Sequence, residues 1–211
     1  MAKLPFGDGP SSDRNVNPRE DAPAGPAADG AAGPEGLARA AGFGRGGPPP
    51  LHQWNPPFCG DIDMVIRRDG TWHYRGTPIG RPAMVRLFAS ILRREGDRFV
   101  LVTPAEKVGI RVEDAPFVAV DCDAAGTGAA QVVTFTTSLG DRVDCGPDHP
   151  LRVAGTADAP APYVTVRPGL EARLDRKTFY RLADLCEDDG SGRFGLRSGG
   201  AFFPVLPPDR P

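Results

Sequence analysis

The sequence is poor in lysine, cysteine and histidine. Of its 25 basic residues only Lys3, Lys107 and Lys177 are lysine. Its four cysteines include no Cys-x-x-Cys pair, and its three histidines stand at no zinc-ligand spacing. We therefore expect reduced thiols, although an even number still permits one disulfide, and we expect neither a metal nor a cofactor. The cysteines are Cys59, Cys122, Cys145 and Cys186, and the histidines are His52, His73 and His149.

Strong charge of one sign and long apolar runs are also absent. The net charge of −2 at pH 7 argues against general nucleic-acid binding through bulk charge. No segment approaches the roughly 20 apolar residues that a membrane-spanning helix needs. Residues 1–30 lack the apolar run of a secretory signal peptide. These features favour a cytoplasmic protein without a membrane span.

Glycine and proline, by contrast, are concentrated at the N-terminus. The first fifty residues hold ten glycines and nine prolines, with few large apolar residues. Ordering such a stretch costs about 1–2 kcal/mol per residue, and little apolar burial is available to offset that cost. We predict a disordered tail over 1–46, either a partner-binding arm or a solvated leader, with a short helical turn at 36–43. An N-terminal unit over 47–113 and a C-terminal unit over 114–207 would follow.

One helical pattern occurs twice in these units. Apolar residues recur at i, i+3, i+4 and i+7 in segments 79–91 and 174–186, and extended segments flank both. This repeat predicts an α+β protein of two repeated sheet-plus-helix units, an internal duplication with a cleft where the copies meet. The identical pairs are Arg81 and Arg176, Arg86 and Arg181, and Leu87 and Leu182.

The boundaries of the two helices can be estimated from local signals. The first should run over 82–94, with Pro82 in its first turn and Gly96-Asp97 after its end. The second should run over 176–187, with Asp175 as its N-cap. Alternating apolar and polar residues predict short strands elsewhere, joined at Asp69-Gly70 by a hairpin turn.

Several long strings in this body also resemble one family. From Trp54 to Val205 the chain is similar to the bacterial domain-of-unknown-function family numbered 1285, through WNPPFCGDIDMVI, LVTPAEKVGIRVEDAPFVA and PYVTVRPGLEARLDR. The resemblance implies a tandem duplication whose C-terminal unit is superficially pleckstrin-homology-like. It further implies a binding site at the domain interface for a nucleotide-like ligand and a link to signalling. It implies no catalytic residue.

The densest polar cluster lies near the middle of the sequence, between two apolar strands. Thr103, Glu106 and Lys107 form a loop that closes at Asp114. A phosphate-bearing ligand needs a fixed cation, a hydroxyl donor and free backbone N–H groups, and this loop could supply all three. The alternative is a simple β-turn whose Glu106 and Lys107 are solvated.

The repeat also places one arginine at the start of each helix. A cation there opposes the helix dipole at a cost of about 0.3–1 kcal/mol, which a ligand anion would offset. We therefore count Arg81 and Arg176 among the candidate ligand-binding residues. The alternative is a structural salt bridge from helix to sheet, with Asp114 or Glu171 as partner.

The remaining candidates are one histidine and two aromatic residues. His149, beside Asp148, is the best general base by residue type, and the alternative is that it caps a turn or is held by a backbone carbonyl. Trp72 and Tyr74 share one face of a strand and could stack a base, or they could belong to the core.

Three functions follow from these features. The first is a sensor that binds a small anionic or nucleotide-like ligand between its units and acts in bacterial signalling. The second is a protein-interaction module without a small-molecule ligand, by analogy with pleckstrin-homology-like folds. The third is a hydrolase or transferase that uses His149. No motif identifies a catalytic residue, so the sequence favours binding over catalysis.

Overall fold

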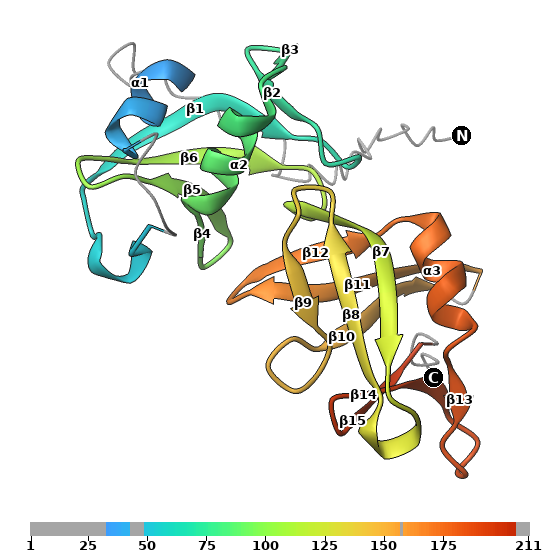
Figure 1. The fold of residues 1–211 in the computed structure, drawn as a ribbon. Coiled ribbons are helices and arrows are strands. Elements are labelled where there is room, and N and C mark those ends of the chain that lie inside the picture. The colour runs from blue at the N-terminus through green and yellow to red at the C-terminus, as the bar shows by residue number, and fades with distance from the viewer. Residues whose placement is uncertain (1–32, 43–48, 157, 206–211) are drawn as a thin grey trace, which may run out of the picture.

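A computed structural model describes residues 33–42, 49–156 and 158–205. Two six-stranded sheets form two units, which lie at the upper left and lower right of Figure 1. Most of the predicted tail over 1–46 lies outside the described residues. Its described part contains the helix α1 (Pro34–Ala40), where the helical turn was predicted.

The N-terminal sheet has the strand order β3-β2-β1-β6-β5-β4. Helix α2 (Pro82–Ser90) buries Met84, Phe88 and Ala89 in the core. The 3-10 helix η1 (Leu51–Gln53) precedes the sheet. The strands are β1 (Phe58–Ile66), β2 (Trp72–Tyr74), β3 (Thr77–Pro78), β4 (Leu92–Glu95), β5 (Arg98–Val102) and β6 (Lys107–Val112).

The C-terminal sheet has the order β10-β11-β12-β7-β8-β9, and a small three-stranded sheet, β13-β14-β15, lies beside it. Helix α3 (Arg176–Ala183) contacts β7. The strands of the C-terminal sheet are β7 (Phe117–Ala125), β8 (Val132–Thr137), β9 (Arg142–Asp144), β10 (Leu151–Thr156), β11 (Ala159–Arg167) and β12 (Leu170–Leu174). A 3-10 turn, η2 (Gly128–Ala130), lies between β7 and β8. The small sheet comprises β13 (Glu187–Asp188), β14 (Phe194–Ser198) and β15 (Ala201–Pro204).

The two large sheets share one topology, which confirms the predicted duplication. In each, the first strand pairs antiparallel with the second and parallel with the sixth. Phe58 of β1 lies opposite Lys107 of β6, and Phe117 of β7 lies opposite Ala172 of β12. The fourth, fifth and sixth strands then continue antiparallel on the far side of the first strand.

The predicted repeat of sheet-plus-helix units holds, but the helices do not occupy equivalent places in the two copies. Helix α2 lies between the third and fourth strands of its sheet, whereas α3 follows the sixth strand. The repeated helical pattern therefore marks two similar amphipathic helices. The duplicated element is the sheet. The pleckstrin-homology-like character of the C-terminal unit stays a prediction.

Both helices are also shorter than predicted. Helix α2 ends at Ser90, and residues 92–95 form β4 instead of a last helical turn. Gly96, at φ +57°, belongs to a hairpin turn in which Glu95 pairs with Arg98. The sequence pattern places the end of the helix at Gly96-Asp97, but the positive φ of Gly96 allows the tight turn that joins β4 to β5. The N-cap of α3 is confirmed, because the Asp175 carboxylate accepts a hydrogen bond from the Thr178 N–H.

The two units pack against each other in one continuous core. Buried residues of both units fall into the same apolar cluster. At the predicted Asp69-Gly70 turn, Gly70 has φ +83°, and a Cβ there would lie 2.8 Å from Cγ2 of Val118 in the other unit. The close approach therefore needs glycine both for its backbone and for its lack of a side chain.

Helix α1 belongs to this core through Leu37 and Ala38. Leu37 is fully buried, and α1 contacts α2. Replacing Leu37 with alanine should lower the free energy of unfolding by about 2 kcal/mol, at the low end for a buried leucine because the short helix can shift. Urea denaturation measures the change. A Glu35→Ala control should cost under about 0.5 kcal/mol, since the Glu35–Arg81 ion pair is largely exposed. A Leu37→Ala loss equal to that control would show that α1 does not contribute to the fold.

Candidate functional site

The polar loop at the middle of the sequence is closed on itself. The Thr103 hydroxyl accepts hydrogen bonds from the N–H groups of Ala105 and Glu106 and donates one to the Glu106 carbonyl. The Lys107 ammonium lies 2.8 Å from Oε2 of Glu95. That contact lowers the pKa of the Glu95 carboxyl, with help from Arg93. The donors expected to hold a phosphate are therefore already used within the N-terminal unit.

Asp114 holds the connection between the two units. Its carboxylate accepts a hydrogen bond from the Tyr163 hydroxyl at 2.7 Å and forms an ion pair with Arg173. Its neighbour Glu113 forms an ion pair with Arg67 of the N-terminal unit. The connection is thus fixed on one side by Glu113 and on the other by Asp114. Asp114 has a structural role that its place in a polar loop did not reveal.

The repeat-related arginines make different contacts from those expected. Arg81 forms an exposed ion pair with Glu35 of α1. Arg176 donates hydrogen bonds to the Tyr180 hydroxyl, one turn along α3. The suggested salt bridges from these helices to the sheet are wrong. Asp114 and Glu171, the suggested partners, instead pair with Arg173 and Arg152.

The aromatic pair and the histidine are also placed by the structure. Trp72 is only 2% exposed and stacks on Phe88 with a ring-centroid distance of 6.1 Å, so it belongs to the core and cannot stack a ligand base. Tyr74 is half-buried beneath the Arg75 guanidinium. Nδ1 of His149 lies 3.0 Å from the Thr165 carbonyl. His149 hydrogen-bonds no other side chain among the residues described, which gives it no acid–base partner.

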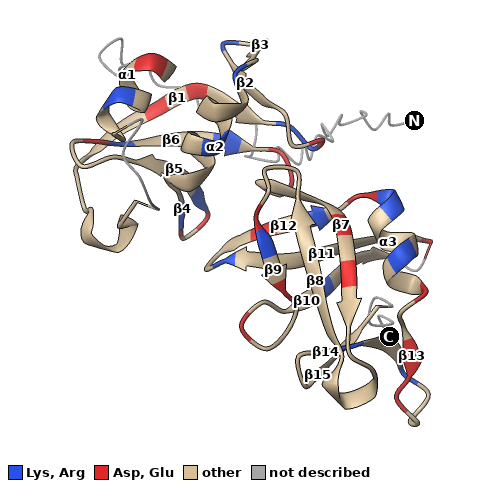
Figure 2. Cartoon of the chain, in the orientation of Figure 1, with Lys and Arg blue, Asp and Glu red and all other residues tan. Residues whose placement is uncertain are grey.

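A cleft of about 640 Å³ does lie between the units, and we call it the Arg167 cleft. One wall comes from residues 49–52 and 86–93 of the N-terminal unit. The other comes from residues 139–141 and 167–170 of the C-terminal unit. Figure 2 shows basic residues on α2 and β4, which contribute to the first wall. The sequence predicted such a cleft but placed other residues in it.

Arg167 is the cation of this cleft that bridges its two walls. It is half-buried above the ring of Phe117, and one Nη donates a hydrogen bond to the Ala89 carbonyl at 2.8 Å. That bond joins the end of β11 to the end of α2 across the two units. Nε of Arg167 is buried and has no partner among the described residues. Burial lowers the pKa of this guanidinium, and the Asp141 carboxylate acts in the opposite direction.

The other two arginines of the cleft differ in how far they are committed. Arg93 donates hydrogen bonds to the carbonyls of Leu51 and Trp54 and pairs with Glu95, so it holds the residues that form one rim. Arg86 is exposed on α2. Neither Arg86 nor Arg167 forms an ion pair with any residue that the structure describes. Among the described residues that line the cleft, Arg86 and Arg167 are therefore two cations without an ion pair, and Asp141 is the single carboxylate.

A second cleft, of about 750 Å³, also joins the units, and we call it the Tyr180 cleft. It combines the Arg68-Asp69 turn with Phe179, Tyr180 and the candidate Arg176 of α3. Tyr180 is 56% exposed. The acidic and basic side chains that line this cleft are equal in number, with Asp69, Asp158 and Asp175 against Arg68, Arg173 and Arg176. This cleft offers the rings of Phe179 and Tyr180, whereas the one ring among the described residues lining the Arg167 cleft is the imidazole of His52.

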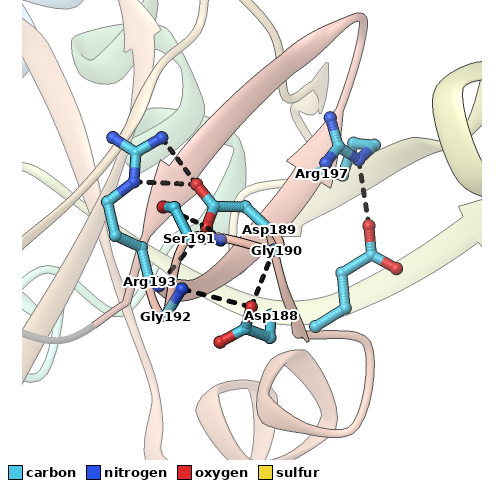
Figure 3. Close-up of polar contacts among 8 residues, drawn as sticks. Asp188, Asp189, Gly190, Ser191, Gly192, Arg193 and Arg197 are labelled. Atoms are coloured by element: carbon cyan, nitrogen blue, oxygen red, sulfur yellow. Dashed lines mark hydrogen bonds and ion pairs between the residues drawn. The ribbon is translucent and has the colours of Figure 1, made fainter.

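The acidic loop between β13 and β14 is a self-contained turn (Figure 3). The Asp189 carboxylate accepts hydrogen bonds from the N–H and hydroxyl of Ser191 and forms an ion pair with Arg193, which lowers its pKa. Asp188 accepts hydrogen bonds from the N–H groups of Gly190 and Gly192. These carboxylates are occupied by their own loop. Within the described ranges no cluster of His, Cys, Asp or Glu forms a metal site.

Three of the four cysteines do not suit nucleophilic chemistry either. Burial raises the pKa of Cys145 to about 12 and that of Cys186 to about 11, so both stay protonated thiols at neutral pH. Cys122 is buried, and its pKa is also raised by desolvation. All four cysteines are free.

No helix within the described residues is long and apolar enough to cross a membrane.

Comparison with known proteins places this architecture in one family. Residues 49–115 match "Domain of unknown function (DUF1285), N-terminal domain", and residues 116–205 match "Protein of unknown function (DUF1285), C-terminal domain". No curated protein matches the chain.

Two crystal structures of DUF1285 family proteins are similar to it. One, from Silicibacter pomeroyi DSS-3, shares 62% identity over 82% of this chain and 95% of its own, with a TM-score of 0.76. The other, from Shewanella baltica OS155, shares 31% identity over 58% of this chain and 91% of its own, with a TM-score of 0.47. The chain therefore belongs to the DUF1285 family.

Proposed function

We propose that this protein is a binding module that takes a small anionic ligand into the Arg167 cleft. The observation that carries the proposal is Arg167 itself. It is a half-buried cation with an unsatisfied Nε and no carboxylate in ion-pair contact among the described residues. A buried donor without a partner costs about 1–3 kcal/mol, and an uncompensated buried charge costs more. A ligand anion at this guanidinium would offset part of the electrostatic cost.

The position of the cleft suits a sensor. Its two walls belong to different units, and Arg167 already bridges them through the Ala89 carbonyl. An anion held between the walls would favour the packing of the units in which both walls contact it. Binding of the ligand would then stabilise one arrangement of the two units relative to others. A role in signalling requires such a change. We therefore place the predicted signalling function in this cleft.

The two alternatives have less support. A protein-interaction module would use exposed apolar side chains, but Phe58, Tyr180 and Phe194 lie on three different elements. A hydrolase or transferase would need His149 beside another reactive side chain, and its ring is instead held by the Thr165 carbonyl. Both alternatives stay predictions.

The proposal is tested by a thermal-shift screen of the full chain against inorganic phosphate, nucleotides and small carboxylates. A ligand at 100 times its dissociation constant stabilises the folded state by about 2.7 kcal/mol, which appears as a raised Tm. We expect at least one anion to raise the Tm. That shift should be lost in Arg167→Met and in Arg86→Met.

Arg86 is exposed, so Arg86→Met keeps the fold even if Arg167→Met weakens it. Arg111→Met is the matched control, because Arg111 is equally exposed but lies on β6 outside both clefts. A shift that survives both cleft variants, or that disappears equally in the control, would rule out the Arg167 cleft as the binding site.

A further inference from the structure

We infer that the ligand of the Arg167 cleft is an aliphatic monocarboxylate, with a hydrocarbon body in place of a nucleobase; this inference rests on the proposed function. The uncharged part of the walls comes mostly from aliphatic side chains of both units. Between its arginines the cleft is lined by Pro49, Leu51, Ala89, Leu92, Leu139 and Leu170. Ala89, Leu92 and Leu170 are already at most 4% exposed, so a hydrocarbon body gains free energy mainly by covering the half-buried Pro49, Leu51 and Leu139.

Nucleobase recognition would need different walls. Bases are held by stacking on aromatic rings and by hydrogen bonds to their edges. No phenylalanine, tyrosine or tryptophan is among the described residues that line this cleft, and the single aromatic ring there is the exposed imidazole of His52, whose Nε2 lies 3.3 Å from Nε2 of Gln53. Its only side-chain hydroxyl, that of Ser90, donates to the Leu87 carbonyl at 2.7 Å. Phe117 lies beneath the Arg167 guanidinium instead of facing the ligand.

The charges of the cleft match a single negative charge. Arg86 and Arg167 are the two cations without ion pairs among the described residues, and Asp141 is the one carboxylate on the walls. Arg93 is already committed to Glu95 and to the rim carbonyls. A di- or triphosphate would place several charges near Asp141, which repels them. One carboxylate can accept two parallel hydrogen bonds from a guanidinium and leaves the net charge of the cleft close to zero.

Isothermal titration of the full chain with hexanoate, octanoate and decanoate, kept below their micellar concentrations, tests the inference against AMP and ATP. We expect Kd to fall by up to about fourfold for each added methylene, the equivalent of about 0.8 kcal/mol per buried CH₂. Decanol, which has the same body without the charge, should bind at least tenfold more weakly than decanoate.

Variants separate the two parts of the ligand. Arg167→Met and Arg86→Met should each weaken decanoate binding about tenfold or more, and Arg111→Met should leave it unchanged. Leu139→Gln, on a half-buried turn residue, should reduce the dependence on chain length while octanoate still binds.

The other outcomes are distinct. AMP binding that is lost in Arg167→Met, without carboxylate binding, would overturn the aliphatic inference and leave the proposed function standing. Carboxylate binding that does not depend on chain length would overturn the inference in the same way. Nucleotide binding that survives Arg167→Met but is lost in Arg176→Ala would move the ligand to the Tyr180 cleft and overturn both. Failure of all of these anions to bind would overturn the inference, and a blank thermal-shift screen with phosphate and small carboxylates would overturn the proposed function as well.

Discussion

Replacing Phe88 with alanine should lower the free energy of unfolding by about 4 kcal/mol, the largest effect that we expect from a single substitution. Phe88 is fully buried on α2 and stacks on Trp72 of β2. Truncation removes a large apolar side chain, leaves a cavity and deletes the aromatic contact. Alanine is the best helix former, so the loss would not come from helix propensity.

Urea denaturation followed by tryptophan fluorescence measures this change, because Trp72 stacks directly on Phe88. The chain has two tryptophans, so a Trp54→Phe background leaves Trp72 as the only reporter. Phe88→Leu in the same background should cost only about 1–1.5 kcal/mol, since most of the apolar area is kept. A Phe88→Ala loss no larger than that of Phe88→Leu would show that α2 is not packed on the sheet as described.

Replacing Asp114 with alanine should cost about 3 kcal/mol. The Asp114 side chain is only 15% exposed, and its loss leaves the Arg173 guanidinium and the Tyr163 hydroxyl without their shared partner. Removing one member of a buried ion pair typically costs 3–5 kcal/mol, because the remaining charge is left uncompensated. The value lies at the low end here because Arg173 is itself partly exposed.

Two further variants isolate the cause. Asp114→Asn keeps an acceptor for the Tyr163 hydroxyl and loses only the charge, so it should cost less than Asp114→Ala. Asp97→Ala removes an exposed carboxylate whose nearest arginine contact is 3.9 Å, and it should cost under about 0.5 kcal/mol. Chemical denaturation of all three gives the comparison. Equal costs for Asp97→Ala and Asp114→Ala would contradict the structural role of Asp114.

Much of the sheet structure could be predicted from the sequence, because its strands alternate apolar and polar residues. The strands around Ile66, Val108 and Phe135 and the cap at Asp175 were all found from local patterns. The segment after Ser90 was not. Its residues suit a helix C-terminus as well as a strand, and only the pairing of Glu95 with Arg98 across Gly96 decides for the strand.

The candidate site was harder to predict because its parts are distant in the sequence. Arg167 meets Ala89 across 78 residues, and no local pattern marks that contact. Thr103 and Lys107 were predicted to bind a ligand because they lie in a polar loop. In the folded chain Thr103 hydrogen-bonds backbone groups of its own loop and Lys107 pairs with Glu95, and the sequence does not show these partners. The internal repeat predicted a cleft between the units, but Arg86 was named only as a repeated residue and not as part of that cleft.

The parallel pairing of first and last strands has a consequence for how the protein is made. During synthesis the emerging β1 can form its hairpin with β2, but the other half of that sheet has no place to attach until β6 has left the ribosome. The same holds for β7 and β12. Such distant closures are slow, because the entropy of a long loop is lost before the contact forms. Nascent chains that end before β6 or β12 would therefore expose open strand edges, the state in which this protein is most prone to aggregate.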